Sequence, residues 1–196
     1  MRKQKGFSLI ELLIVVAIIL IIAAIAIPNL MRARIAANES SAVGSIRNLI
    51  TQEIAYQSTY ASTQGYAPAI INLGPPAGQT ACAPTLVPTS VSACLIDGVL
   101  SGSDPLEAGQ AVKSGYGFEA IGSNPTAAGQ NQSFTAAGVP VTFNSSGTKD
   151  FCAFEDGVVR ALPPAATNTG GYAGAQALAG SGGAATCTLP PWAALQ

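Results

Sequence analysis

A single carboxylate, Glu11, lies near the start of a long apolar run. Residues 12–27 are sixteen consecutive apolar residues, and the run extends back to Phe7 with Ser8 and Glu11 as its only polar members. A charge at the centre of a bilayer costs about 2.5–3.5 kcal/mol, and less near the interface. The position of Glu11 therefore requires a compensating interaction.

Besides Glu11, four cysteines have side chains that could do chemistry. An even number of cysteines is typical of proteins in compartments where disulfides form and persist, and four cysteines allow three pairings. A zinc site would need closer cysteine spacing or histidine, and neither is present. The sequence therefore predicts disulfides and no metal among these residues, which are Cys82, Cys94, Cys152 and Cys187.

The composition argues against several functions. Histidine is absent, which removes the commonest general acid or base and the commonest transition-metal ligand. The formal net charge is -1, and three of the nine basic residues lie within the first five positions, so no basic surface for nucleic acid is predicted. The adjacent Glu155 and Asp156 supply too few oxygens for calcium and, with Gly157, favour a hairpin turn. We expect neither an enzyme nor a cofactor.

A long N-terminal helix must position Glu11. Residues 7–27 are long enough, at 1.5 Å per residue, to cross the hydrocarbon core of about 30 Å. Arg2, Lys3 and Lys5 precede the span, so the positive-inside bias places them in the cytoplasm and the rest of the chain outside it. An ordinary signal peptide cut after Ala26 is the alternative, but such a peptide has no use for Glu11.

The helical pattern continues beyond Pro28 to about residue 60. Apolar side chains recur there at multiples of three to four, while charged and amide side chains fill much of the remaining surface. We expect one helix with a kink or loosened turn at Pro28; two helices broken at Pro28 are the alternative. The apolar positions are Ile35, Val43, Ile46, Ile50 and Ile54, and those assigned to the surface are Arg32, Arg34, Glu39, Arg47, Gln52 and Glu53.

The stretch KGFSLIELLIVVAIILIIAAIAIP, residues 5–28, resembles the class III signal of type IV prepilins and of type II secretion pseudopilins. Gly6, Phe7 and Glu11 match the last leader residue, the first mature residue and the fifth mature residue of that family. Pro28 falls where the family's helix is often kinked. The resemblance covers roughly the first thirty residues of the chain.

The resemblance implies how these residues function. A prepilin peptidase would cut after Gly6 on the cytoplasmic face and methylate the new N-terminus of Phe7. The carboxylate of Glu11 would meet the α-amine of a neighbouring subunit during assembly. The implied partners are identical or related pilin subunits, the peptidase, an inner-membrane assembly platform with its motor, and membrane lipid before assembly.

The remaining chain predicts a small soluble domain. Residues 61–114 are an irregular connection, residues 115–162 hold an antiparallel sheet of three or four strands, and residues 163–196 are a Gly- and Ala-rich tail. We favour a disulfide between Cys82 and Cys94, which closes a short loop. The other favoured pair, Cys152 with Cys187, staples the tail to a strand and is similar to the C-terminal disulfide loop of many pilins. The strand-like stretches are 115–121, 139–143, 150–154 and 157–162.

The predicted fold is α+β and pilin-like, with a long helix packed on a small antiparallel sheet. The predicted function is a structural subunit of a type IV pilus, held in the inner membrane with a periplasmic domain and then assembled outside the cell. A pseudopilin of a type II secretion system is the alternative, with a periplasmic filament. A secreted globular protein with an ordinary signal peptide is a more remote one.

Overall fold

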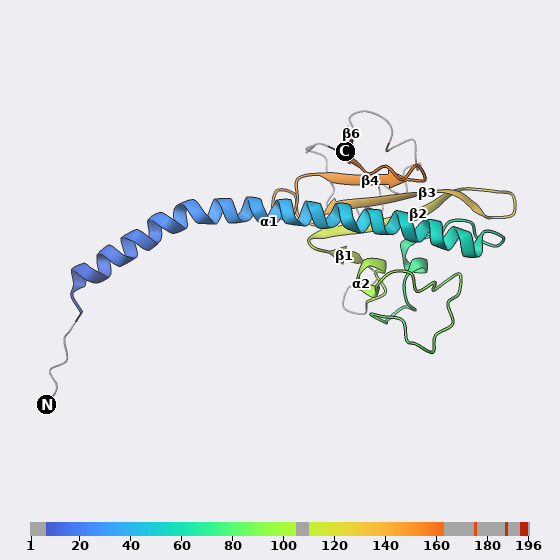
Figure 1. Ribbon diagram of the computed structural model, residues 1–196, viewed down its shortest axis with the longest axis horizontal. Coiled ribbons are helices and arrows are strands. Elements are labelled where there is room, and N and C mark those ends of the chain that lie inside the picture. The colour runs from blue at the N-terminus through green and yellow to red at the C-terminus, as the bar shows by residue number, and fades with distance from the viewer. Residues whose placement is uncertain (1–6, 105–109, 163–174, 176–186, 188–192, 196) are drawn as a thin grey trace. The chain divides into compact units, whose positions relative to one another are not determined.

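The computed structural model describes residues 7–104, 110–162, 175, 187 and 193–195 (Figure 1). The chain divides into two compact units, residues 1–34 and residues 35–196. The expected leader, residues 1–6 with Gly6, lies outside the described residues, as does most of the expected tail.

Helix α1 is one continuous helix over Leu9–Tyr60, with Pro28 inside it. The prediction of a single helix is therefore confirmed, and the alternative of two helices is wrong. The chain leaves α1 through a tight turn in which the amides of Gln64 and Gly65 both donate to the carbonyl of Tyr60. Gly65 adopts a left-handed φ of 72°, the conformation with which glycine commonly ends a helix.

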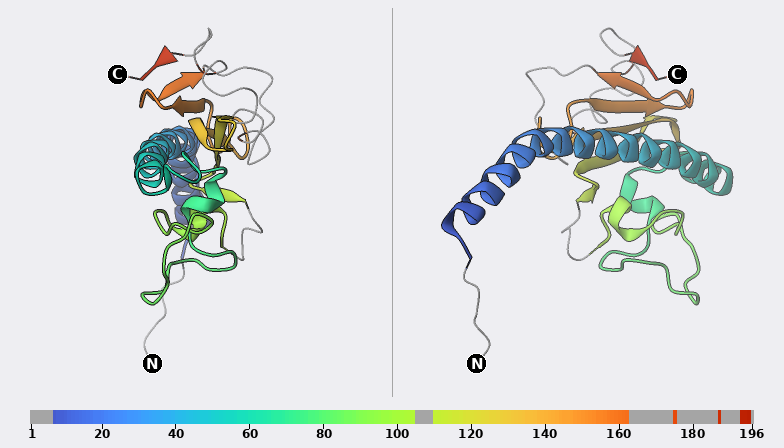
Figure 2. Two further views of the ribbon diagram at one scale, coloured as in Figure 1. Left: turned by 90° about the vertical axis from the view of Figure 1, so that its right-hand side faces the viewer. Right: turned by 60° about the vertical axis from the view of Figure 1, so that its left-hand side comes forward.

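Six strands form one antiparallel sheet whose spatial order follows the sequence (Figures 1 and 2). Among the described residues, each strand pairs with its neighbours along the chain. The strands are β1 (Ala111–Lys113), β2 (Tyr116–Pro125), β3 (Asn131–Pro140), β4 (Asp150–Phe154), β5 (Arg160–Leu162) and β6 (Ala193–Ala194).

The part of α1 in the second unit packs on one face of this sheet. Phe118, Gly138 and Phe151 are cross-strand neighbours on that face. A Cβ atom on Gly138 would lie 3.0 Å from Phe118 Cε1 and 3.1 Å from Ile46 Cδ1, so glycine permits the close approach of α1. The fully buried side chains of this core include Ile46, Leu49, Tyr56, Tyr116, Phe118 and Phe134.

The expected sheet differs from the observed one in strand number and in one strand position. Strands β1 and β6 have three and two residues and lie outside the expected range 115–162. The stretch 139–143 was expected as a strand, but β3 ends at Pro140 and begins at Asn131. Strand β3 begins with Asn131, Gln132 and Ser133, which have low strand propensity, and the strand is held extended by nine residue pairs with β2.

The helix face was also assigned incorrectly at two adjacent positions. Ile54 was expected in the core but its side chain is 51% exposed, whereas Glu53 was expected at the surface and is fully buried. Glu53 lies seven residues after Ile46 and four after Leu49, which places it on their face of the helix. The helical spacing carried this signal, and the charge of Glu53 obscured it.

The connection between α1 and β1 contains two short helices. These are η1 (Ile70–Leu73), a 3₁₀-helix, and α2 (Gly98–Ser101). Asp97 caps α2 by accepting a hydrogen bond from the amide of Leu100, and its carboxylate also pairs with Lys113 of β1 at 3.0 Å. Asp97 therefore stabilises α2 and also links the connection to the edge strand of the sheet.

Candidate functional site

The first unit presents an apolar surface along its whole described length. From Phe7 to Met31, every large apolar side chain is exposed, by 45% to 82% of its area. Glu11 is the only ionisable side chain between these two residues. By its length and composition, α1 is able to cross a membrane. An apolar surface of this extent needs lipid or other protein to cover it.

Glu11 and Ser8 cap the first turn of α1 reciprocally. The backbone amide of Ser8 donates a hydrogen bond to Glu11 Oε2 at 3.0 Å, and the amide of Ile10 donates to Ser8 Oγ at 3.3 Å. The carbonyl of Ser8 accepts the first helical bond, from the amide of Leu12. This arrangement is a capping box, in which two unpaired helix amides are satisfied by side chains.

The capping box partly answers why a carboxylate is tolerated in this run. The N-terminus of a helix carries a partial positive charge, which favours a carboxylate in the first turn. The hydrogen bond from Ser8 satisfies one oxygen of Glu11 within the same chain. The sequence analysis did not single out Ser8, although Ser-x-x-Glu before an apolar run is the known pattern of such a box.

The sequence-predicted site residues fall into two groups in the structure. Phe7 and Glu11 lie at the start of the apolar segment, where Phe7 is 82% exposed. Pro28 lies within the same helix, 17 residues beyond Glu11. The cysteines belong to the second unit and form a separate feature.

Comparisons with known proteins find one sequence motif and two relatives. The prokaryotic N-terminal methylation motif matches residues 1–27. The chain is 46% identical over 77 residues to the type IV wide pilus major component PilA4 of Thermus thermophilus, which covers 38% of this chain and 56% of that protein. It is 40% identical over 72 residues to the type IV major pilin protein PilA of Myxococcus xanthus, which covers 34% of this chain and 33% of that protein.

The chain is therefore similar to type IV pilins over part of its length. The match spans about half of one relative's length and a third of the other's. No solved structure matches the chain. The likeness to pilins rests on the N-terminal motif and the two relatives.

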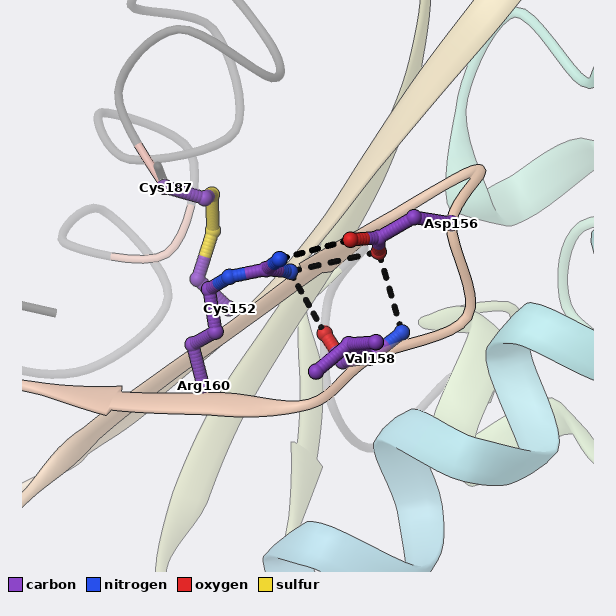
Figure 3. Close-up of a disulfide and its surroundings, with 5 residues drawn as sticks. All are labelled: Cys152, Asp156, Val158, Arg160 and Cys187. Atoms are coloured by element: carbon purple, nitrogen blue, oxygen red, sulfur yellow. Dashed lines mark hydrogen bonds and ion pairs between the residues drawn. A yellow bond between two sulfur atoms is a disulfide. The ribbon is translucent and has the colours of Figure 1, made fainter. Parts of the chain in front are cut away.

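Two disulfides link parts of the second unit. Cys82 pairs with Cys94 and Cys152 pairs with Cys187, which are the two pairs favoured from the sequence. Cys152 and Cys187 are fully buried, whereas Cys82 and Cys94 are only partly buried. Cys152 lies on β4, so its bond fixes one point of the C-terminal region to the sheet (Figure 3).

Arg160 and Asp156 form an ion pair beside the buried disulfide (Figure 3). Arg160 Nη2 lies 2.6 Å from Asp156 Oδ2, and the guanidinium stacks 4.6 Å from the centre of the Phe154 ring. Burial opposes the charge of Asp156, but its hydrogen bonds with Arg160 and Val158 outweigh that effect and lower its pKa. Asp156 is therefore engaged in closing the turn between β4 and β5.

Among the described residues, the buried carboxyls lie in the second unit. Burial raises the pKa of Glu53 to about 8 and that of Asp150 to about 6. Neither residue was singled out from the sequence as a site residue. Among the residues that the structure describes, no cluster of three or more potential metal ligands is present.

Proposed function

We propose that this protein is a type IV pilin, a structural subunit of a type IV pilus filament. The chain inserts in the inner membrane, is cut after Gly6, is N-methylated at Phe7 and polymerises through its N-terminal helix. The observation that supports this most directly is the exposed apolar segment that carries one carboxylate, capped at the helix start. The relatives are named as pilus components, which favours a pilus over a secretion pseudopilus.

Assembly exchanges one apolar environment for another. In the membrane, lipid covers the exposed side chains of residues 7–31; in the filament, the helices of other subunits cover them. Helices in an apolar medium associate through packing and through polar contacts, because lipid tails are as apolar as the side chains. The polar contact at Glu11 therefore contributes specificity that the apolar surface alone does not.

Glu11 sets the stagger between subunits in this proposal. Cleavage after Gly6 creates an α-amine on Phe7, and the carboxylate of Glu11 accepts the charged amine of the neighbouring subunit. Only one of the two Glu11 oxygens accepts the amide of Ser8, so the other remains available for the neighbour. In an apolar medium, an unpaired charge is costly, which disfavours a wrong stagger.

The first experiment determines the N-terminus of the mature protein. We would purify it from cells that carry a prepilin peptidase and measure the intact mass and the sequence of the terminal fragment. N-methyl-Phe7 is the expected result. An N-terminus at Ile27 would mean a signal peptide cut after Ala26, and the filament proposal would be dropped.

The second experiment tests the role of Glu11 in assembly. In the Glu11→Ala variant, we expect normal membrane insertion and cleavage but loss of sheared filaments seen by electron microscopy, because the amine has no partner. Glu155→Gln is the matched control, since Glu155 is exposed in the second unit. Filaments formed by Glu11→Ala at the normal level would contradict the proposed role.

A further inference from the structure

Three apolar side chains of residues 66–73, the segment that follows α1, are buried in the core that the helix and the sheet share, whereas Pro68 and Ile71 of that segment are exposed. Ala67 and Leu73 are fully buried and Ile70 is 2% exposed. Tyr66 and Asn131 of β3 form two hydrogen bonds of 3.1 Å: the amide of Tyr66 donates to the carbonyl of Asn131, and Asn131 Nδ2 donates to the carbonyl of Tyr66. Residues 66–73 are therefore anchored in the core at these points and lead on to the loop that the Cys82–Cys94 disulfide closes.

The carboxyl group of Glu53 holds this segment from the helix side. Glu53 Oε2 accepts the backbone amide of Ala67 at 2.9 Å. Glu53 Oε1 has no hydrogen-bond partner among the residues that the structure describes, and the residue is fully buried. One hydrogen bond is poor compensation for a buried negative charge, because a desolvated carboxylate needs several donors.

Among the residues that the structure describes, no positively charged group acts on the pKa of Glu53. The phenols of Tyr56, on the next turn of α1, and Tyr66, on the buried segment, both interact electrostatically with it. Glu155 is a further acidic group that acts on Tyr66. The carboxyl of Glu119, on β2, accepts the amide of Ile70 at 3.4 Å, so a second acidic group touches the same segment.

We infer that Glu53 is a proton-dependent latch, which holds residues 66–73 against α1 when it is protonated and releases them when it ionises. The neutral carboxyl keeps its hydrogen bond to the Ala67 amide without placing a charge in the core. The ionised carboxylate needs water, which reaches it only if the segment moves away. The latch is independent of the filament proposal, since it lies wholly within the second unit.

Burial sets the pH range in which the latch acts. It raises the pKa of Glu53 from 4.5 to about 8, and the hydrogen bond from Ala67 lowers it only in part. In the released state, where water reaches the carboxyl, the pKa returns toward its ordinary value. Between these two values, release becomes about tenfold more favourable per pH unit, and above about pH 8 the effect levels off.

Amide hydrogen exchange of the full chain in detergent micelles tests the latch. After correction for the intrinsic base-catalysed rate, we expect the opening of the Ala67 amide to increase about 100-fold from pH 5.5 to pH 8. The Leu100 amide is the internal reference. It donates at 2.8 Å to Asp97, whose pKa is lowered by its hydrogen bonds and by Lys113 despite partial burial, so its opening stays constant.

The Glu53→Gln variant keeps an amide oxygen for Ala67 but cannot ionise, so its Ala67 opening is expected to stay constant with pH. Constant opening in the native chain, or an equal rise in Glu53→Gln, would overturn the inference. If the variant fails to fold, the Glu53 carboxyl carbon of the native chain is titrated by NMR. A midpoint near 8 supports the latch, and a midpoint below 6 refutes it.

Discussion

Three glutamates on α1 occupy three different environments. Glu11 lies in the apolar segment and accepts an amide of its own chain. Glu39 Oε1 accepts both the amide and the hydroxyl of Thr148, at 3.0 and 2.6 Å. Glu53 is fully buried with one hydrogen bond from Ala67. A glutamate therefore caps the helix at position 11, binds the helix to the β3–β4 connection at position 39 and is a buried acid at position 53.

Removal of the cap hydroxyl should loosen the start of α1. In the Ser8→Ala variant, the amide of Ile10 loses its acceptor, and loss of such a cap costs about 1 kcal/mol. Hydrogen exchange in micelles should show the Ile10 amide opening about fivefold more often. Ser58→Ala near the other end of α1 is the control, since Ser58 caps no helix N-terminus. Unchanged exchange at Ile10 would show that the hydroxyl is not needed.

At the scale of elements, the side chains of Asn38 and Glu39 bind α1 to the connection between β3 and β4. Asn38 Nδ2 donates to the carbonyl of Ser146 at 2.8 Å, and Glu39 Oε2 lies 3.5 Å from Lys149 Nζ. These contacts lie just after the first unit ends at Arg34. They stabilise the helix on the sheet where the continuous apolar core begins.

Truncation of Glu39 should destabilise the second unit more than truncation of a nearby surface residue. Glu39→Ala leaves two donors of Thr148 unpaired, and hydrogen bonds to charged groups contribute about 1.5–3 kcal/mol. We expect a lower urea midpoint for the change in circular dichroism. Ser41→Ala removes one exposed hydroxyl contact with Ser114 and should change the midpoint little. Equal midpoints for the two variants would show that the hydrogen bonds between Glu39 and Thr148 do not stabilise the second unit.

The elements differ in how well the sequence predicts them. The apolar run and its helical spacing predict α1 because a helix forms its hydrogen bonds within one segment. Strands β1 and β6 have three and two residues, too few for alternation to be recognised. The first half of β3 is extended because it pairs with β2, and that partner is invisible to a local pattern.

At the scale of the whole molecule, the two units differ in whether their large apolar side chains are buried. The second unit has a buried core and two disulfides, whereas the first exposes its large apolar side chains. By chain entropy, the disulfide over the 12-residue separation contributes about 3 kcal/mol and the one over 35 residues about 4 kcal/mol. The pair on β4 is therefore the more stabilising of the two.

The two disulfides should respond differently to a reducing agent. Cys82 and Cys94 are partly exposed, and Cys94 holds a left-handed φ of 57°, whereas Cys152 and Cys187 are fully buried. Under native conditions, we expect a dithiol to open the Cys82–Cys94 bond first. Alkylation followed by mass spectrometry of peptides identifies the opened pair. The reverse order would mean that access does not control reduction.

The sequence by itself determined what depends on nearby residues: the apolar segment, its single carboxylate, the N-terminal motif and the helix. These features need no distant partner, because cleavage motifs, hydropathy and helical hydrogen bonds are local. Only the tertiary structure decided that Glu53 is buried and Ile54 exposed, that β3 begins at Asn131, and that Glu39 holds Thr148. Each of these depends on which segments pack together, since burial and strand pairing are properties of contacts between residues far apart in the chain.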